Sequence, residues 1–276
     1  MTLIEAIILG IVQGLTEPLP VSSSAHLVIV PALIPGFHQP SVAFDVLLHL
    51  GTLLAVVFFL RRDIGALLVS LMPGSTQNNH ATGSGAGETA ANRRMVLWIL
   101  IATFLTGAIG VLFKDRIERL FESVEITACM LFITGILLFG SDRVKTNLRR
   151  KDDMNLQDAI VLGLVQAVAL IPGISRSGST ITFGIFRGLE RETAARFSFL
   201  LSIPAIGGAA ILKSADLMRL TTGDLPALGA GFLTAAVTGF LSLKFLFVII
   251  NKTGLAPFAW YCWFIGSATL IIRGIG

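Results

Sequence analysis

The chain has 276 residues, of which 54% are hydrophobic and only 14% are charged, and its formal net charge is +4. Soluble domains carry about a quarter charged residues, so this composition excludes a soluble globular protein and indicates an integral membrane protein. The Lys and Arg residues stand at the ends of apolar segments, where they orient a membrane protein, and we therefore expect no nucleic-acid partner.

The first apolar segment, residues 3–34, is interrupted by Pro18, Pro20 and Pro31. Proline lacks a backbone N–H and clashes with the preceding helical turn, so a straight membrane-spanning helix is not expected here. A broken backbone at membrane depth is tolerated only where it is buried in protein or lines a wet cavity. We therefore predict a re-entrant helix–loop–helix hairpin, which enters and leaves the bilayer on the same side.

Three apolar segments follow, each at or near the roughly 20 residues that a membrane-spanning helix needs. They are Val42–Leu60, Val96–Phe113 and Ile126–Phe139. The intervening residues 61–95 carry an arginine pair near each end and a stretch rich in Gly, Ser, Thr and Asn, which predicts a flexible loop. Together these elements form a predicted first repeat, residues 1–140.

A second segment broken by proline and glycine, residues 156–187, predicts a second re-entrant hairpin. It opens a predicted second repeat, residues 156–276, which continues with three further spans. They are Thr193–Leu212, Leu225–Ile250 and Ala256–Ile272. The two hairpins align at a fixed offset of 153 residues, as from Gln13 to Gln166. Duplicated, broken apolar segments that carry polar residues indicate a site at membrane depth.

These elements predict an all-α polytopic membrane protein, a single domain over residues 1–276 with six transmembrane helices plus two re-entrant hairpins. Three spans separate the hairpins, and because three is odd, the second hairpin enters from the opposite face and the repeats have inverted topology. Lys and Arg concentrate in residues 61–95 and 140–155, which places these loops in the cytoplasm and both termini outside. The first hairpin then opens outward.

Both hairpins carry polar residues among apolar ones. In the first, Gln13 and Glu17 are spaced i, i+4 and share one helix face. The polar residues that follow in the first hairpin are Ser22, Ser23, Ser24 and His26. Those of the second hairpin are Ser175, Arg176, Ser177, Ser179, Thr180 and Thr182. A charge buried in a membrane is costly and by default marks a functional site. If the hairpin tips meet, one pocket holds a carboxylate, an imidazole, a guanidinium and several hydroxyls.

That combination suits phosphate chemistry. The planar fork of Arg176 matches phosphate oxygens. Its Gly/Ser-rich turn feeds a helix whose N–H groups would face an anion. The further phosphate-binding candidates are the hydroxyls of Ser22, Ser175, Ser177 and Thr180. Glu17, with the Gln13 carbonyl, could hold a divalent cation, Mg²⁺ or Ca²⁺, which would neutralise phosphate oxygens. His26 suits general acid/base work, and Ser23 is close enough in sequence to be its nucleophile.

The same residues admit structural interpretations. Glu17 and Arg176 could be an ion pair that only fixes the hairpins, and His26 could be an interfacial histidine. The glutamines Gln13 and Gln166 could be interhelical hydrogen-bond partners. Three hydroxyls are assigned structural roles: Ser24, Ser179 and Thr182. The pair Asp45 and His49, at i, i+4 in the first full span, either lines the same cavity or serves capping and packing.

The motifs resemble a known family. The segments Gln13-x-x-x-Glu17, Pro20-Val-Ser-Ser-Ser-Ala-His26 and Pro172-Gly-Ile-Ser-Arg-Ser-Gly-Ser-Thr180 look like the signature motifs of the bacterial undecaprenyl-pyrophosphate phosphatases, also called bacitracin resistance protein. The resemblance extends over essentially the whole chain. It departs from many members at one position, because Gln13 stands where they carry glutamate.

The resemblance implies hydrolysis of undecaprenyl diphosphate to the monophosphate and inorganic phosphate, which supplies the lipid carrier for peptidoglycan precursors and confers bacitracin resistance. It further implies a multi-pass bacterial plasma-membrane protein with inverted repeats, divalent-metal dependence and a homodimeric state. Matched position by position, it places the metal-binding pair on Gln13 and Glu17, the motif serine and histidine on Ser23 and His26, and the phosphate-binding arginine on Arg176. It leaves open whether Ser23, His26 or water is the nucleophile.

Two functions remain open at this point. The first is the lipid diphosphatase, with the active site facing outward. The second is a polyprenyl-phosphate transporter or flippase, because inverted repeats with broken midplane helices are also the usual construction for alternating access. The two are distinguished by chemistry, since a transporter releases no phosphate.

Overall fold

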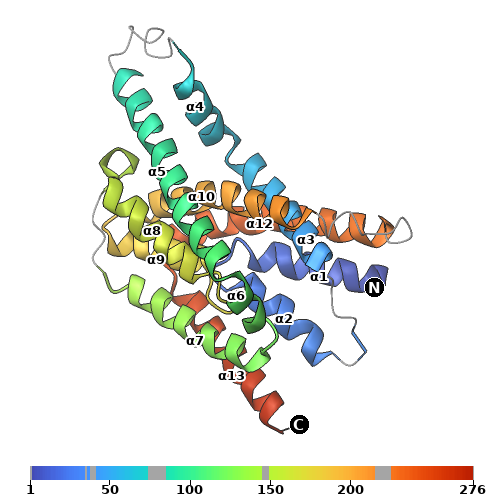
Figure 1. Ribbon diagram of the computed structural model, residues 1–276. Helices are drawn as coiled ribbons and strands as arrows, with labels where there is room; N and C mark the ends of the chain where they lie inside the picture. Colours follow the sequence, from blue (N-terminus) through green and yellow to red (C-terminus); the bar gives the residue numbers. More distant parts are fainter. Residues whose placement is uncertain are drawn as a thin grey trace.

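A computed structural model describes residues 2–34, 36–37, 42–73, 85–144, 149–214 and 225–275, and this part of the chain is built from helices (Figure 1). The first hairpin consists of α1 (Leu3–Thr16) and α2 (Ser23–Leu33). Thr2 caps α1 together with Glu5 in a capping box. The helix ends as the chain reaches Pro18 and Pro20, which cannot donate to a continuing helix.

The second hairpin consists of α8 (Leu156–Val168) and α9 (Arg176–Phe186), and it repeats the first closely. Helices α1 and α8 begin at residues 3 and 156, which are 153 residues apart. The same distance separates the starts of α2 and α9, at residues 23 and 176. In each repeat the hairpin is followed by a longer helix, α3 (Val42–Phe59) or α10 (Arg191–Leu212). The offset seen in the sequence therefore carries through to the helices themselves.

The remaining long helices lie close to the predicted spans. They are α5 (Gly85–Leu112), α7 (Val124–Ser141), α12 (Leu225–Lys252) and α13 (Ala256–Ile275). Among the described residues, four helices are long and apolar enough to cross a membrane, namely α5, α7, α10 and α12. A fifth span is added if α3 and the next helix, which meet at a bend of 73°, form one broken span. The chain is thus a multi-pass membrane protein.

The prediction of a flexible loop over residues 61–95 is wrong at both ends. Residues 61–71 form α4 (Arg61–Leu71), and α5 already begins at residue 85. Helix α4 forms because Ile64 and Leu67 pack against the hydrophobic core and Asp63 pairs with Arg196 of α10. The middle of the predicted loop, residues 74–84, lies outside the described residues. A further short helix, α6 (Lys114–Leu120), follows α5.

Each hairpin packs on a long helix of the other repeat. Helix α1 lies on α12, and α8 lies on α5. Both contacts depend on glycine. A Cβ at Gly10 would come within 2.5 Å of the Gly231 carbonyl, and one at Gly163 within 2.8 Å of Ala102 Cα. This crossed packing brings the turns of the two hairpins, residues 17–22 and 169–175, into the same part of the molecule.

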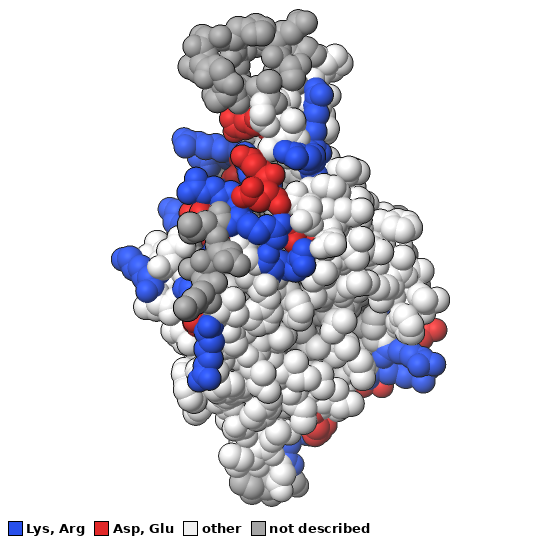
Figure 2. All heavy atoms as spheres, turned by 90° about the vertical axis from the view of Figure 1, so that its left-hand side faces the viewer, with Lys and Arg blue, Asp and Glu red and all other residues white. Residues whose placement is uncertain are grey.

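The surface agrees with a membrane environment. Figure 2 shows a broad uncharged band across the middle of one face, with charged side chains gathered mainly toward one end. Large apolar side chains point outward from the long helices, as at Phe104 (74% exposed) and Leu112 (76% exposed). Exposed apolar surface on this scale is expected where the solvent is lipid.

Candidate active site

The N-termini of two helices face one cavity. Ser22 caps α2, with its Oγ accepting from the Ala25 N–H at 3.4 Å, and Ser175 caps α9, with its Oγ accepting from the Gly178 N–H at 3.0 Å. The cavity has a volume of about 190 Å³. Its polar lining residues from the two turns are Glu17, Ser22, Ser23, Ser24, Ser175, Arg176 and Ser177. Helix N-termini present unpaired N–H groups and partial positive charge, so this cavity is suited to an anion.

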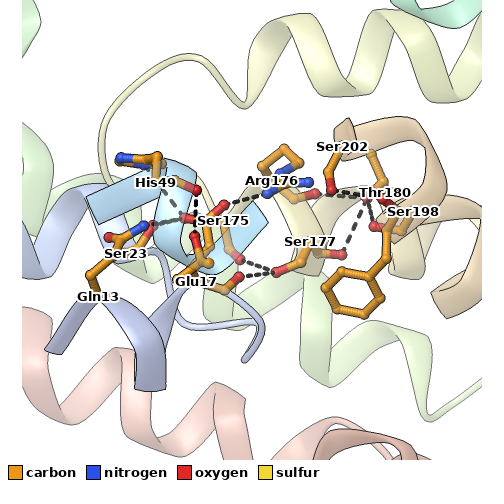
Figure 3. A network of polar contacts seen from close by, with 12 residues as sticks. Gln13, Glu17, Ser23, His49, Ser175, Arg176, Ser177, Thr180, Ser198 and Ser202 are labelled. Carbon is orange, nitrogen blue, oxygen red and sulfur yellow. Dashed lines mark hydrogen bonds and ion pairs between the residues drawn. The ribbon is translucent and has the colours of Figure 1, made fainter. Parts of the chain in front are cut away.

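Glu17 is the centre of the polar network in Figure 3. Its Oε1 accepts a hydrogen bond from Arg176 Nη2, which makes an ion pair between the two hairpins. Its Oε2 accepts from Ser23 Oγ and, at 3.2 Å, from Gln13 Nε2. The Ser177 hydroxyl donates to the Glu17 backbone carbonyl at 3.5 Å. The predicted meeting of carboxylate and guanidinium is confirmed, and the Ser23 hydroxyl is held beside a potential proton acceptor.

Two buried groups at this network have no partner. Arg176 Nη1 has no hydrogen bond, although Arg176 lines the cavity, and neither has Gln13 Oε1. Buried polar groups are nearly always satisfied, and an exception calls for a ligand, water or ion. The free donor of Arg176 fits a phosphate oxygen. The free acceptor of Gln13 fits a cation or a hydroxyl.

The turn before Arg176 is fixed by helix α7. Thr134 Oγ1 donates to the Gly173 carbonyl at 2.8 Å and accepts from the Ser175 N–H at 3.0 Å. Gly173 has φ +94°, and a Cβ there would lie 2.3 Å from the Thr127 carbonyl oxygen. Both the left-handed conformation and the close approach require glycine. The guanidinium is therefore carried on a rigid turn.

His26 is not brought to the carboxylate. Its Nδ1–H donates to the Ser22 carbonyl at 2.8 Å, and its Nε2 accepts from the Tyr261 hydroxyl of α13 at 2.8 Å. The two rings also stack, with centroids 5.6 Å apart. Ser22 has φ +66°, which is rare for a residue other than glycine. His26 thus holds the strained residue that precedes Ser23, and it does not line the cavity.

Of the other predicted phosphate ligands, the structure places Ser22, Ser175 and Ser177 in the cavity wall and Thr180 outside it. The Thr180 hydroxyl lies against the Arg176 carbonyl, at 2.8 Å, and the hydroxyl of Ser198. The Thr180 hydroxyl therefore stabilises the first turn of α9.

His49 is the histidine that approaches the network. Its Nε2 lies 3.6 Å from Glu17 Oε2, and its Nδ1–H donates to the Asp45 carbonyl at 2.8 Å. It lines the cavity from α3. In the sequence, only its i, i+4 spacing from Asp45 indicated a role for His49. The two alternatives were lining the cavity or capping and packing, and His49 lines the cavity. Gln166 makes an interhelical hydrogen bond, with its Nε2 donating to Thr106 Oγ1 of α5 at 3.1 Å, and it also lines the cavity with a buried Oε1 that has no partner.

The donor set is compatible with a hard cation that shares its ligands with a substrate. No group of three or more His, Cys, Asp or Glu side chains that could hold a metal occurs within the described ranges. The candidate oxygen donors are the Glu17 carboxylate, which lines the cavity and accepts from Gln13 Nε2, and the Gln13 Oε1, which has no partner and does not line the cavity. Mg²⁺ is commonly held by one or two protein carboxylates plus substrate phosphates and water, which fits so sparse a set.

Comparison with known proteins gives a family. The family model of bacitracin resistance protein BacA matches residues 6–268. A protein of Moorella thermoacetica named undecaprenyl-diphosphatase is 45% identical over 262 residues, 95% of this chain and 94% of its own. Proteins of the same name are 42% identical over 267 residues in Methanobrevibacter smithii, 96% of both chains, and 42% over 275 residues in Geobacter metallireducens, 98% of both. The chain therefore belongs to the bacitracin resistance protein BacA family.

Proposed function

We infer that the chain is an undecaprenyl-diphosphatase, a hydrolase that converts undecaprenyl diphosphate to undecaprenyl phosphate and inorganic phosphate. The observation that carries this inference is the cavity at the two helix N-termini. It is lined by Arg176, which has a free guanidinium donor, and by Ser23, whose hydroxyl is bonded to Glu17. The full-length relatives bear the name of this activity. The product is the lipid carrier for peptidoglycan precursors, and its supply accounts for bacitracin resistance.

The geometry supports Ser23 as the nucleophile. As Ser23 Oγ attacks the terminal phosphorus, its proton passes to Glu17 Oε2, to which it is already hydrogen-bonded. The bond from phosphorus to the bridging oxygen breaks, and undecaprenyl phosphate leaves. Glu17 passes the proton to the bridging oxygen of the departing undecaprenyl phosphate and is again a carboxylate. Water then attacks the phosphoserine while Glu17 takes one of its protons and returns it to Ser23 Oγ, so that phosphate is released and the serine hydroxyl is regenerated. Arg176 and the backbone N–H groups of α2 and α9 stabilise the charge that develops on the phosphate oxygens.

We assign a divalent cation, Mg²⁺ or Ca²⁺, to Glu17 and Gln13. When bound, the ion would neutralise charge on the phosphate oxygens. Gln13 offers its unpartnered Oε1 but no charge, so the protein contributes a single carboxylate. His26 is assigned a positioning role, because both ring nitrogens are occupied away from the cavity.

We propose that the hairpins are re-entrant and that six helices span the membrane, with the repeats inverted in a single domain. The longest hairpin helix, α1, has 14 residues, and at about 1.5 Å per residue it is shorter than the roughly 30 Å hydrocarbon core. The distribution of Lys and Arg supports an orientation with residues 61–95 and 140–155 in the cytoplasm and a site that opens outward. The bacterial plasma-membrane location is proposed from the family resemblance. We retain a homodimer as a proposal from the family resemblance.

The transporter alternative gains no separate support. A transporter needs no hydroxyl that is hydrogen-bonded to a carboxylate, whereas a hydrolase can use such a pair as nucleophile and base. Ser23 and Glu17 form this pair in the cavity. The phosphatase accounts for Ser23, Glu17 and Arg176 with one reaction.

The test is phosphate release from undecaprenyl diphosphate by the purified protein. We expect Arg176→Ala and Glu17→Ala to lose at least about a hundredfold in kcat, as for removal of a charge-stabilising group. Arg196→Ala is the matched control, because Arg196 also makes an ion pair, with Asp63, but does not line the cavity. Normal turnover by both site variants would contradict the assignment. A comparison of Ser23→Ala with His26→Ala separates nucleophile from positioning residue, because only the former should remove phosphoenzyme formation.

A further inference from the structure

His49 lies beside the Glu17 carboxylate without a hydrogen bond to it (Figure 3). Its Nε2 is 3.6 Å from Glu17 Oε2, which is too long for a hydrogen bond. Two donor atoms that bind one metal ion at about 2.1 Å lie about 3.0 Å apart at a right angle and about 3.6 Å apart at 120°. The gap between this nitrogen and this oxygen therefore has the size that two ligands of one ion leave between them.

The ring nitrogen of His49 that faces Glu17 carries a lone pair. The other ring nitrogen, Nδ1, lies 2.8 Å from the Asp45 carbonyl, which can only accept, so the proton of the neutral ring is on Nδ1. A metal-binding histidine nearly always donates its second ring N–H to a carboxylate or a backbone carbonyl in this way. The imidazole is thus already oriented as a ligand, with its Nε2 toward the carboxylate.

Helix α3 fixes the direction of the His49 side chain. Leu48 and Thr52 are buried, and a Cβ at Gly51 would lie 2.6 Å from the Phe232 carbonyl oxygen, so α3 is in close contact with α12 at this point. The side chain of His49 is 29% exposed and lines the cavity. An ion in the cavity therefore meets the imidazole without any movement of the backbone.

The pair of carboxylate and imidazole occurs in one repeat only. At the offset of 153 residues, Glu17 corresponds to Leu170, and His49 corresponds to Ser202. Ser202 is fully buried, and its hydroxyl donates to the Phe199 carbonyl within α10 at 2.7 Å. The equivalent positions of the second repeat thus hold neither group. Because the two groups are present together in one repeat and absent together from the other, a shared role is indicated.

We propose that His49 Nε2 is a ligand of the divalent cation, which binds between this nitrogen and Glu17 Oε2. The proposal rests on the proposed function, from which it takes the cation, and deepens it by adding a nitrogen ligand. Histidine binds metals as the neutral imidazole. It therefore adds a donor without adding charge beside Arg176, which is bonded to the other oxygen of Glu17.

The same arrangement gives the Gln13 amide a part in the site. Its Nε2 now lies 3.2 Å from Glu17 Oε2, and its Oε1 has no partner. A half-turn of the amide exchanges the two atoms and brings the free oxygen to the cation side of the carboxylate. The remaining coordination positions are then left to phosphate oxygens of the substrate and to water, as is common for such ions.

The experiment uses Mn²⁺ as the probe, because its unpaired electrons report nitrogen nuclei that bind it directly. Electron spin echo envelope modulation is recorded on the full chain, purified without a polyhistidine tag, with ordinary and with ¹⁵N-labelled histidine. We expect nitrogen modulation that changes with the isotope. It should be lost in His49→Gln and in His49→Ala, and kept in the control His26→Gln, because His26 does not line the cavity.

A second measurement separates a ligand from a structural residue. Ca²⁺ takes oxygen ligands, whereas imidazole binds transition metals. His49→Gln should therefore weaken Mn²⁺ binding by at least about tenfold, the lower end of what loss of a group that only orients a ligand costs. Ca²⁺ binding should change by less than about threefold. A structural role for His49 would weaken the binding of both ions equally.

Four outcomes would overturn the proposal. They are failure of the wild type to bind Mn²⁺, bound Mn²⁺ without a histidine signal in the wild type, a signal that persists in both His49 variants, and equal losses for the two ions. The isotope result needs no variant, so it decides the matter even if both substitutions prevent folding. A histidine signal in protein that releases no phosphate would instead refute the phosphatase and leave His49 as a metal ligand.

Discussion

The ion pair between Glu17 and Arg176 joins two segments that are 159 residues apart in the chain, and it gives a prediction for stability as well as for activity. The side chains are 9% and 17% exposed. For two unit charges about 4 Å apart, at an effective dielectric constant of about 20, the attraction is about 4 kcal/mol. Removal of one partner from a buried pair leaves the other uncompensated and typically costs about 3–5 kcal/mol.

We therefore expect Arg176→Gln alone to destabilise the folded protein by about 3–5 kcal/mol, because the Glu17 charge is then buried without its partner. At about 2–4 °C per kcal/mol, a loss of 4 kcal/mol lowers Tm by about 8–16 °C. The double variant Glu17→Gln/Arg176→Gln has no buried charge at this position and should regain most of the lost stability. It should remain inactive, because both chemical groups are gone.

The assay is thermal unfolding of the purified protein in detergent, followed by tryptophan fluorescence, with phosphate release measured in parallel. Full stability of Arg176→Gln would show that the two charges are not coupled in the fold. A double variant whose loss equals the sum of the two single losses would show the same. Recovery of activity in the double variant would leave the pair structural and overturn its assignment to the active site.

Three further predictions concern the supports of the site. Tyr261→Phe removes the hydroxyl that donates a hydrogen bond to His26 Nε2. Because one hydrogen bond contributes about 0.5–1.5 kcal/mol net, the rate of phosphate release should fall by about three- to tenfold. An unchanged rate would contradict the positioning role of His26. Gly173→Ala should lower the free energy of unfolding by more than about 1 kcal/mol, because residue 173 has a positive φ. The control Gly65→Ala adds a Cβ that meets nothing within 4 Å, and in the same unfolding assay it should be neutral or stabilising. Gln13→Glu places a second carboxylate about 3.2 Å from Glu17 Oε2, so repulsion between the two charges should lower Tm when a chelator is present. Addition of Mg²⁺ should raise Tm more in this variant than in the wild type. An identical response to Mg²⁺ in both proteins would contradict a cation at Glu17 and residue 13.

The contact between the hairpins could be predicted because its physical cause is local and strong. A lone carboxylate and a lone guanidinium in apolar segments are costly, so each requires a partner, and the chain offers few. The break within each hairpin could be predicted for a similar reason, since proline follows the end of α1 and proline and glycine follow the end of α8. These inferences need only the identity of single residues.

The two histidines could not be assigned in this way. Which of them faces Glu17 depends on how α2 and α3 are rotated about their axes, and the rotation of α2 is tied to the positive φ of Ser22 and to Tyr261, 235 residues further along the chain. Helix α4 was missed for a related reason. Its sequence begins with Arg61 and Arg62, and its stability depends on packing and ion pairing with distant helices.

The exact spacing of the two hairpins has a last consequence. At an offset of 153, the position of Ser23 in the first hairpin corresponds to that of Arg176 in the second, so equivalent places in the duplicated structure hold a hydroxyl and a guanidinium. Neither hairpin on its own contains both the proposed nucleophile and the proposed phosphate-binding guanidinium. The two halves of the chain are therefore not interchangeable, and the cavity needs one turn from each of them.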